Sequence, residues 1–365
     1  MDRFLNGRVE WFEYELMEYS SNAYKTAGLL SNIESGGITI DFTRDIIGSA
    51  SFNISGSEIN DISFLTDRIK PWYCFIASGE TYKYPLGEYF LSSPKDSFTD
   101  LYNKKAIQGF DILLALEQAK LETSYILVAD SNIIEEIKTL IESVAPWLVY
   151  SFNNSAAVNN EDITYVTGKS LLFVINGLLN AISWTPLWAD SNGVLRSSPW
   201  SENTNIIWSF EDNNEGLYLP EFSRDINYTD IYNKVLVITN SSDADNFFSA
   251  TLTFEELGMD DHPYSITSIG RTILKKFDSE SVSQDYVDQR AKRELLKMSE
   301  IEELISYKHA FATTKNGGLP DIGDGYSFKN SVNNINSVYN IEKMSWSFDV
   351  GKPVDSVIRR NRYVR

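Results

Sequence analysis

Two stretches near opposite ends of the chain alternate apolar and polar residues with a period of two. Residues 38–43 read Ile-Thr-Ile-Asp-Phe-Thr, and residues 50–55 resume the pattern after a turn. Residues 305–312 alternate in the same way close to the C-terminal end. Because successive side chains of a strand point to opposite faces of a sheet, this period predicts strands with one buried and one solvent-exposed face. Antiparallel sheet should therefore dominate both ends of the chain.

The first 108 residues are predicted to form a small antiparallel barrel or sandwich. The hairpin of residues 38–55 is accompanied by strand-like stretches at residues 9–16, 72–77 and 84–91. These stretches are rich in aromatic and β-branched residues, which favour strands. We therefore expect residues 1–108 to be the first β domain.

The character of the sequence changes after residue 108. Apolar residues at helical spacing predict helices near residues 112–119 and 132–144, and the second begins with a sequence that resembles a capping box. A third helix is expected at residues 169–182, followed by a hairpin around the turn Asp190–Gly193. Residues 109–215 are therefore predicted to form an α+β domain.

Strand patterns return towards the C-terminus and are interrupted by a helical segment. Residues 235–239 alternate again, and a helix is expected to begin after Ser283 as its N-cap. We predict a second antiparallel β-barrel domain from residues 216–250 and 301–365, split by a helix-containing insertion at residues 251–300. The predicted fold class is α+β and mainly β.

Charge and cysteine content narrow the possible functions. The chain has 51 acidic residues against 32 Lys and Arg, a formal charge of −19, which repels phosphate backbones and disfavours ordinary nucleic-acid binding. One cysteine, Cys74, and two histidines, His262 and His309, are too few for a zinc cluster or a disulfide framework. Neither a secretory signal nor a membrane span is recognisable, so we expect a protein made in a cytosol-like compartment without membrane insertion.

No set of residues predicts catalysis, a cofactor or a bound metal. Gly168-Lys169-Ser170 stands where a phosphate-binding loop would lie, but the glycine needed five residues earlier is Ile163. The sequence contains no G-x-S-x-G nucleophile motif, and Cys74 lies in an apolar stretch typical of a buried strand. With 51 acidic residues and eight tryptophans, a carbohydrate-binding or glycoside-cleaving protein stays an alternative.

Four arginines close this acidic chain. They are Arg359, Arg360, Arg362 and Arg365. They could be a solvated chain end or a docking tail for an acidic neighbouring surface. The sequence leaves both interpretations open.

The order of the segments and several short motifs resemble the baseplate hub, or tail-tip hub, proteins of tailed bacteriophages and contractile injection systems. Leu319–Phe328 looks like a turn-then-strand segment that occurs late in such hubs. The family-like structural motif within it comprises Pro320, Gly323, Asp324 and Gly325. Residues 340–349 and 354–360 resemble the closing hairpin of these proteins, and residues 269–272 with the helix after them resemble their inserted segment.

The resemblance implies a homotrimeric structural protein. In such hubs both β domains are similar to tail-tube subunits, so three chains supply six similar barrels. They match a sixfold tube or a distal tail protein on one side and a threefold tip, spike or fibre on the other. The resemblance also implies a virion protein, assembled in the host cytoplasm, with a channel through which DNA passes without specific binding.

Neither a cofactor nor enzymatic activity is expected on this interpretation, because the chain stops at the closing strands without a lytic extension. Two alternatives remain. One is a carbohydrate-binding or glycoside-cleaving tail-associated protein. The other is an unrelated multidomain binding protein whose β segments are independent sandwiches.

Overall fold

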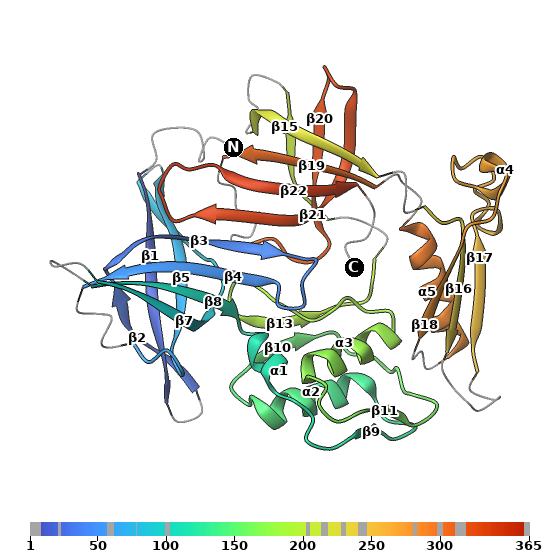
Figure 1. Ribbon diagram of the computed structural model, residues 1–365, viewed down its shortest axis with the longest axis horizontal. Coiled ribbons are helices and arrows are strands. Elements are labelled where there is room, and N and C mark those ends of the chain that lie inside the picture. Colours follow the sequence, from blue (N-terminus) through green and yellow to red (C-terminus); the bar gives the residue numbers. More distant parts are fainter. Residues whose placement is uncertain are drawn as a thin grey trace.

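The computed structural model describes residues 9–20, 23–56, 62–77, 79–98, 103–201, 205–212, 218–227, 231–239, 247–279, 283–297, 302–310 and 319–360. The chain has strand-rich regions at both ends, a mixed α and β region between them, and a lobe of strands and helices at one side (Figure 1). This arrangement confirms the predicted fold class. Within these ranges, no helix has the length and apolar character that a membrane crossing requires.

Strands from both ends of the chain form one sheet. Hydrogen-bonded neighbours follow the order β15-β19-β22-β21-β3-β4-β8-β7-β5-β1-β2, with β6 beside β5, β20 beside β21 and β14 beside β20. The N-terminal strands are β1 (Val9–Ser20), β2 (Ala23–Leu30), β3 (Ile33–Asp41), β4 (Gly48–Ser55), β5 (Arg68–Ala77), β6 (Glu80–Pro85), β7 (Tyr89–Phe98) and β8 (Asn103–Asp111). The C-terminal strands are β14 (Asn205–Glu211), β15 (Tyr218–Asn227), β19 (Glu302–His309), β20 (Asp324–Asn330), β21 (Ile335–Ser347) and β22 (Val354–Arg360).

The strands have the burial pattern that the sequence predicts. In β4, Ala50, Phe52 and Ile54 are buried, while the polar residues between them are partly exposed. Strands β3 and β4 pair as an antiparallel hairpin, as expected for residues 38–55. Because alternation is a local property, it locates strands without naming the strands they pair with.

Strand β3 of the N-terminal region pairs with β21 of the C-terminal region, and we call this pairing the β3–β21 joint. The antiparallel register places Gly37 opposite Ser347. Thr39 Oγ1 and Ser345 Oγ lie 3.0 Å apart across the joint. Glycine is required at position 37 because a Cβ atom there would lie 2.3 Å from the carbonyl oxygen of Trp346. Backbone hydrogen bonds thus connect the two β regions directly.

One apolar core runs through both β regions. Phe348, just after β21, packs against Phe52 of β4 with ring centroids 5.6 Å apart, and against Tyr14 of β1 at 5.1 Å. Phe210 and Tyr326 of the C-terminal region belong to the same cluster of buried side chains. The two β regions therefore share a core, which independent sandwiches would not do.

The middle region has its own core around its three helices. Its elements are α1 (Leu114–Gln118), β9 (Tyr125–Leu127), α2 (Ile133–Val144), β10 (Val149–Phe152), β11 (Ile163–Tyr165), α3 (Leu171–Ala181), β12 (Trp188–Ala189) and β13 (Val194–Ser197). Asn132 caps α2 by accepting a hydrogen bond from Glu135 N at 3.1 Å, as the sequence predicted.

The insertion lobe comprises residues 231–239, 247–279 and 283–297, and it contacts the middle region where Arg293 Nη2 donates to Asn180 Oδ1 at 2.8 Å. Its elements are β16 (Lys234–Thr239), β17 (Ser249–Thr253), the 3₁₀ helix η4 (Glu255–Leu257), α4 (Ile266–Ile269), β18 (Leu274–Ser279) and α5 (Gln284–Leu296). The three strands follow the order β17-β16-β18, and α5 covers one face with Val287, Ala291 and Leu295.

Two strands lie on the other side of the predicted domain limits. Strand β16, assigned by its period to the second barrel, pairs with β17 and β18 of the lobe. Strand β14, within the predicted range 109–215, pairs with β20 of the C-terminal region. The reason is that strand partners are chosen by long-range packing, which a local pattern does not encode. The division into separate domains stays a prediction.

Candidate functional site at the domain junction

The predicted motif around Pro320 forms a tight turn before β20. Asp324 Oδ2 accepts a hydrogen bond from Asp321 N at 2.8 Å, and Asp324 N donates to Asp321 O at 3.1 Å. Gly323 has a φ of +89°, a conformation that favours glycine. Gly323 and Asp324 of the motif therefore help to close the Asp321–Asp324 turn, while Gly325 pairs with Asn340 in the sheet.

This turn connects three parts of the chain. Trp188 Nε1 in β12 donates to Asp321 Oδ1 at 3.1 Å. Asn205 Nδ2, at the start of β14, donates to Asp324 Oδ1 at 2.6 Å. The Trp188 ring is buried in the core that the β regions share. The middle region and the C-terminal β region therefore meet at the Asp321–Asp324 turn.

Burial changes the acidity of both aspartates. Desolvation raises the pKa of Asp324 to about 6, although hydrogen bonds from Asp321 N and Asn205 act in the opposite direction. Desolvation also raises the pKa of Asp321. Removing a carboxylate from water favours its neutral form. We therefore expect Asp324 to take up a proton at mildly acidic pH.

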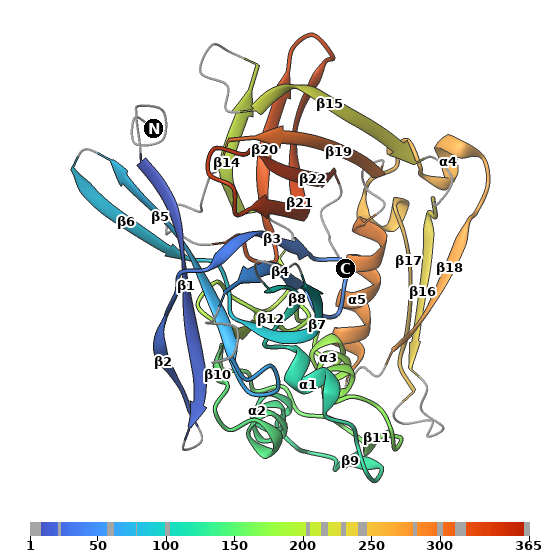
Figure 2. The same cartoon turned by 60° about the vertical axis from the view of Figure 1, so that its left-hand side comes forward.

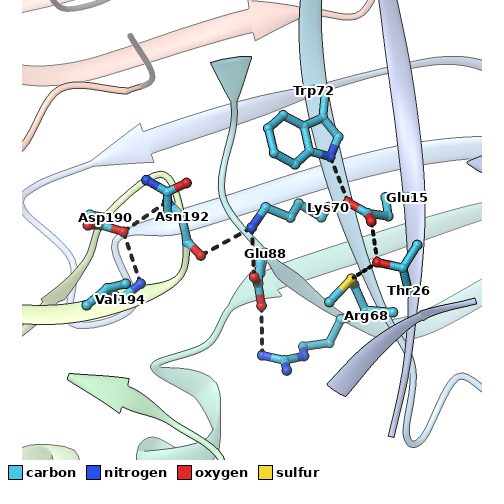
Figure 3. Close-up of polar contacts among 10 residues, drawn as sticks. Glu15, Thr26, Arg68, Lys70, Trp72, Glu88, Asp190, Asn192 and Val194 are labelled. Carbon is cyan, nitrogen blue, oxygen red and sulfur yellow. Dashed lines mark hydrogen bonds and ion pairs between the residues drawn. The ribbon is translucent and has the colours of Figure 1, made fainter. Parts of the chain in front are cut away.

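Asp190 organises a second turn, two residues after Trp188 (Figure 3). Its Oδ1 accepts hydrogen bonds from the backbone N of Asn192 at 2.9 Å and of Val194 at 3.0 Å. Its Oδ2 pairs with Arg196 Nε at 2.6 Å. The hairpin predicted around Asp190–Gly193 is thus present as strands β12 and β13.

Glu88 connects this second turn to the N-terminal β region. Its carboxylate pairs with Arg68 Nη1 and with Lys70 Nζ, each at 3.0 Å, and Lys70 Nζ also donates to Asn192 O at 3.3 Å (Figure 3). Gly193 permits the close approach, since a Cβ atom there would lie 2.8 Å from Glu88 Cδ. We call this group the Glu88 junction.

Aromatic rings surround Arg68 within the junction. Its guanidinium carbon lies 3.2 Å from the ring centroid of Tyr24, 4.6 Å from that of Trp147 and 5.4 Å from that of Phe90. Burial lowers the pKa of Arg68, while the Glu88 carboxylate acts to raise it. The faces of aromatic rings attract a cation. Because Trp147 follows α2, this contact attaches the middle region to the N-terminal sheet.

The predicted docking tail is partly engaged within the chain. Arg359 Nε pairs with Glu342, and Arg360 Nη1 lies 3.6 Å from Glu303. Both arginines belong to β22. Arg362 and Arg365 lie outside the described residues. Docking by this tail stays a prediction.

The other residues considered as candidates for catalysis or ligand binding lie in places where they have a structural role. Ser170 Oγ accepts a hydrogen bond from Phe173 N at 3.2 Å, so Gly168-Lys169-Ser170 is the start of helix α3. Cys74 is fully buried, and burial raises the pKa of its thiol to about 11. Burial lowers the pKa of His309 to about 4. A neutral thiol and a neutral imidazole in a core are consistent with packing roles.

The junction positions segments of the chain through hydrogen bonds and ion pairs. In the part of the chain that the structure describes, no group of three or more His, Cys, Asp or Glu side chains is placed to hold a metal ion. Sequence reasoning found the two turns but missed Arg68 and Glu88. Their only signal is a charged residue next to apolar strand residues, which does not identify the partner.

Comparison with known proteins shows which solved structures share this architecture. No family model matches the chain, and no curated protein does. Among solved structures, the tail protein from Neisseria meningitidis MC58 superposes with a TM-score of 0.63 at 12% identity, covering 96% of each chain. The 43 kDa tail protein of prophage MuSo2 from Shewanella oneidensis gives 0.61 at 12%, covering 96% of this chain and 99% of that one. A chain of the Francisella PdpA-VgrG complex gives 0.56 at 12%, covering 98% of this chain and 59% of that one.

At this identity the likeness shows the fold. The chain has the mainly β fold of phage tail proteins over nearly its whole length. The expected resemblance to tail and baseplate hub-type proteins is thereby confirmed as a resemblance of fold.

Proposed function

We propose that this protein is a structural, non-enzymatic tail hub. It forms a homotrimer that joins the sixfold tail tube, or a distal tail protein, to the threefold tip, spike or fibre. The observation that carries the proposal is the single sheet that runs through both β regions across the β3–β21 joint. The fold likeness to phage tail proteins over 96% of the chain supports it.

Symmetry adaptation follows from the number of β regions. Each chain contributes an N-terminal and a C-terminal region, so three chains around an axis present six. A sixfold arrangement requires a constant orientation between the two regions of each chain. The β3–β21 joint, the Glu88 junction and the Asp321–Asp324 turn supply contacts that hold such an orientation.

Contacts between copies would use the ends of the shared sheet. Strands β15 and β2 terminate the path of hydrogen-bonded strands that the structure describes. A strand edge presents backbone N–H and C=O groups that pair readily with another chain. A ring of three copies gives such edges a partner.

We assign the channel wall to the polar face of the shared sheet. Beside the β3–β21 joint this face forms a shallow hollow rich in hydroxyl and amide groups. Its lining includes Thr39, Ser49, Ser51, Gln108, Ser345 and Ser347. The lining also contains Lys308, Lys352 and Asp355, and Lys308 pairs with Asp355 at 2.7 Å. The uncharged groups of the hollow do not attract phosphates, and the chain as a whole repels them with its charge of −19. DNA would therefore pass without specific binding.

The proposed partners are other tail components, with the protein at the tail tip or baseplate of the virion after assembly in the host cytoplasm. A chain of the same fold occurs in the Francisella PdpA-VgrG complex, which is a precedent for this fold within a larger assembly. The proposed docking tail, Arg359, Arg360, Arg362 and Arg365, would bind an acidic neighbour there, and Arg359 and Arg360 would do so while paired with Glu342 and Glu303 of their own chain.

Light scattering and class-averaged micrographs test the proposal. Three chains of 41.5 kDa should scatter as a particle of about 125 kDa, and the averages should show a threefold ring with a central hole. A monomer would contradict the hub. Turnover of cell-wall glycans would instead support the carbohydrate-binding or glycoside-cleaving alternative.

A further inference from the structure

The sheet of the insertion lobe has one covered face and one open face. Val235 and Val237 of β16 are fully buried in the core beneath α5. Leu236 and Ile238 alternate with them and therefore point to the opposite face. Both are only partly buried, and the lobe core, as the described residues define it, contains neither. The sheet thus presents an apolar centre on the side away from α5.

Strand β18 extends this open face. Its parallel register with β16 places Leu274 beside Lys234, and Lys276 beside Leu236. Leu274 is 52% exposed. In both ribbon views α5 stands between the three strands and the rest of the chain, so the open face points outward (Figures 1 and 2). We call Lys234, Leu236, Ile238, Leu274 and Lys276 the lobe face.

The edge around the lobe face is basic, although the chain is acidic. Residues 271–276 contain Arg271, Lys275 and Lys276 and no acidic residue, and Lys234 lies on the adjacent strand. The nearest acid along β18 is Asp278, which pairs with Lys276 at 2.9 Å. In a chain of formal charge −19, this is a local reversal of sign. A partner surface with acids around an apolar centre would complement it.

The middle region carries such a surface on the ribbon of β9 and β11. Ile126, Val128 and Val166 are 53%, 60% and 58% exposed. The antiparallel register pairs Ile126 with Thr164, so these two point outward together. We call Ile126, Val128, Thr164 and Val166 the ribbon face.

Acidic residues surround the ribbon face. The two segments that form it, residues 121–131 and 158–168, contain Glu122, Asp130, Glu161 and Asp162 and no Lys or Arg, while Lys120 and Lys169 adjoin them at one end of the ribbon. The wider range 109–215 has four Lys and Arg against fourteen Asp and Glu, a net charge of −10 out of the total of −19. The lobe of the same chain cannot cover the ribbon face, because α5 lies between the lobe face and the rest of its own chain. A second copy can.

We infer that the lobe face of one copy docks on the ribbon face of the next copy. The inference rests on the proposed homotrimer and names one of its contacts. Two different surfaces meet, so the contact is heterologous, the kind that closes into a ring when the rotation permits. The apolar centres lose water-exposed surface on contact, while the opposite charges around them set the register and speed association.

Site-specific cross-linking tests the contact directly. Cys74 is the single cysteine of the sequence and is fully buried, so an introduced surface cysteine is the accessible thiol. Leu274→Cys and Ile126→Cys are placed in two differently tagged copies, which are co-expressed and treated with a short bismaleimide. We expect a cross-linked dimer that carries both tags. Each variant expressed without the other should give no cross-linked dimer.

The outcomes separate this inference from the hub proposal. A trimer that gives no mixed cross-link overturns the contact and leaves the hub standing. A monomer overturns both. A cross-link between two Leu274→Cys copies shows that the lobe face of one copy contacts the lobe face of another. This result would overturn the ribbon face as its partner.

Charge reversal supplies a second readout. Lys234→Glu with Lys276→Glu should weaken association of the copies at least tenfold at low salt, because acids would then face acids. Co-expression with a copy that carries Glu122→Lys and Thr164→Lys should restore mixed assembly. Leu65→Asp is the matched control, since Leu65 is 94% exposed in the N-terminal region and should leave association unchanged. Unchanged association of the double glutamate variant, with an unaltered melting temperature, would refute the contact.

Discussion

The β3–β21 joint and the insertion lobe use the same element, a strand pair, for different purposes. The joint pairs residues as far apart as Thr39 and Ser345, separated by 306 positions, and both β regions share one core. The lobe pairs β16 with nearby strands and closes a small core of its own beneath α5. Long-range pairing therefore makes the two β regions one unit, which we call the frame, and we expect both to unfold together. Local pairing makes the insertion lobe a unit that we expect to unfold without the frame.

The largest expected effect comes from truncating the side chain that both β regions bury. Phe348→Ala should lower the free energy of unfolding by about 4 kcal/mol, because it removes a buried ring and leaves a cavity. Urea denaturation followed by fluorescence measures the change. Val350→Ala is the control: Val350 is 54% exposed, and its loss should cost less than about 0.5 kcal/mol. Equal effects of the two variants would contradict a shared core.

Blocking the approach of the two strands should have the next largest effect. Gly37→Val brings its Cβ atom against the Trp346 carbonyl, so the backbone of the joint must shift, at a cost of about 3 kcal/mol. Thr39→Val keeps the backbone and removes only the hydroxyl contact with Ser345, which should cost about 1 kcal/mol. If the two variants have the same urea midpoint, the joint tolerates a side chain at position 37. The contrast between the β3–β21 joint and the insertion lobe would then be unsupported.

Removing the charge at the Glu88 junction should cost somewhat less. Glu88→Gln leaves buried Arg68 without its carboxylate, and we expect a loss of about 2 kcal/mol. Adding Arg68→Met should recover part of this loss, because the uncompensated charge is then gone. Calorimetry of the single and double variants measures the coupling. Strictly additive losses would mean that the ion pair does not connect the two regions energetically.

A cavity in the insertion lobe should destabilise the lobe and leave the two β regions unchanged. Leu295→Ala opens a cavity beneath α5, so amide hydrogen exchange in α5 and β16 should become faster. The main unfolding transition should move by less than about 0.5 kcal/mol, since the lobe core is separate from the shared core. A loss of protection in β3 and β21 would show that lobe and frame unfold as one unit.

A further prediction concerns the pH dependence of stability at the Asp321–Asp324 turn. The folded pKa of Asp324 is raised to about 6 by burial, so the folded state binds the proton more tightly than the unfolded state. Its contribution to stability is fully present only below the ordinary pKa of 3.8, and it is lost as the pH rises from there through 6. We expect about 2 kcal/mol less stability at pH 7 than at pH 4 from this group, and a flatter profile in Asp324→Asn.

Other groups titrate in the same range, so the informative quantity is the difference in stability between the wild type and Asp324→Asn at each pH. Burial raises the pKa of Asp111 to about 7, which gives a contribution of the same sign. The lowered pKa of His309 gives the opposite sign, because stability is lost as the pH falls from 6.5 towards 4. Parallel profiles of wild type and Asp324→Asn would show that Asp324 does not respond to pH in this window.

Several local features of the fold were predictable from the sequence. Alternation located β4, and the Asn132 cap located the start of α2. Ser283 is the N-cap residue of α5, although its side chain makes no capping hydrogen bond. The turns at Asp190 and Asp324 were also recognisable, because glycine and aspartate favour turns through their own backbone contacts. What these two turns contact was not predictable.

By itself, the sequence determined where strands, helices and turns form, and that their apolar faces need a core. These are local properties, set by side-chain period and by caps. The tertiary structure alone decided that β3 pairs with β21, that β16 joins the lobe, and that Glu88 meets the 190–193 turn. Such choices depend on non-local packing, in which many strands with the same alternation compete for one partner.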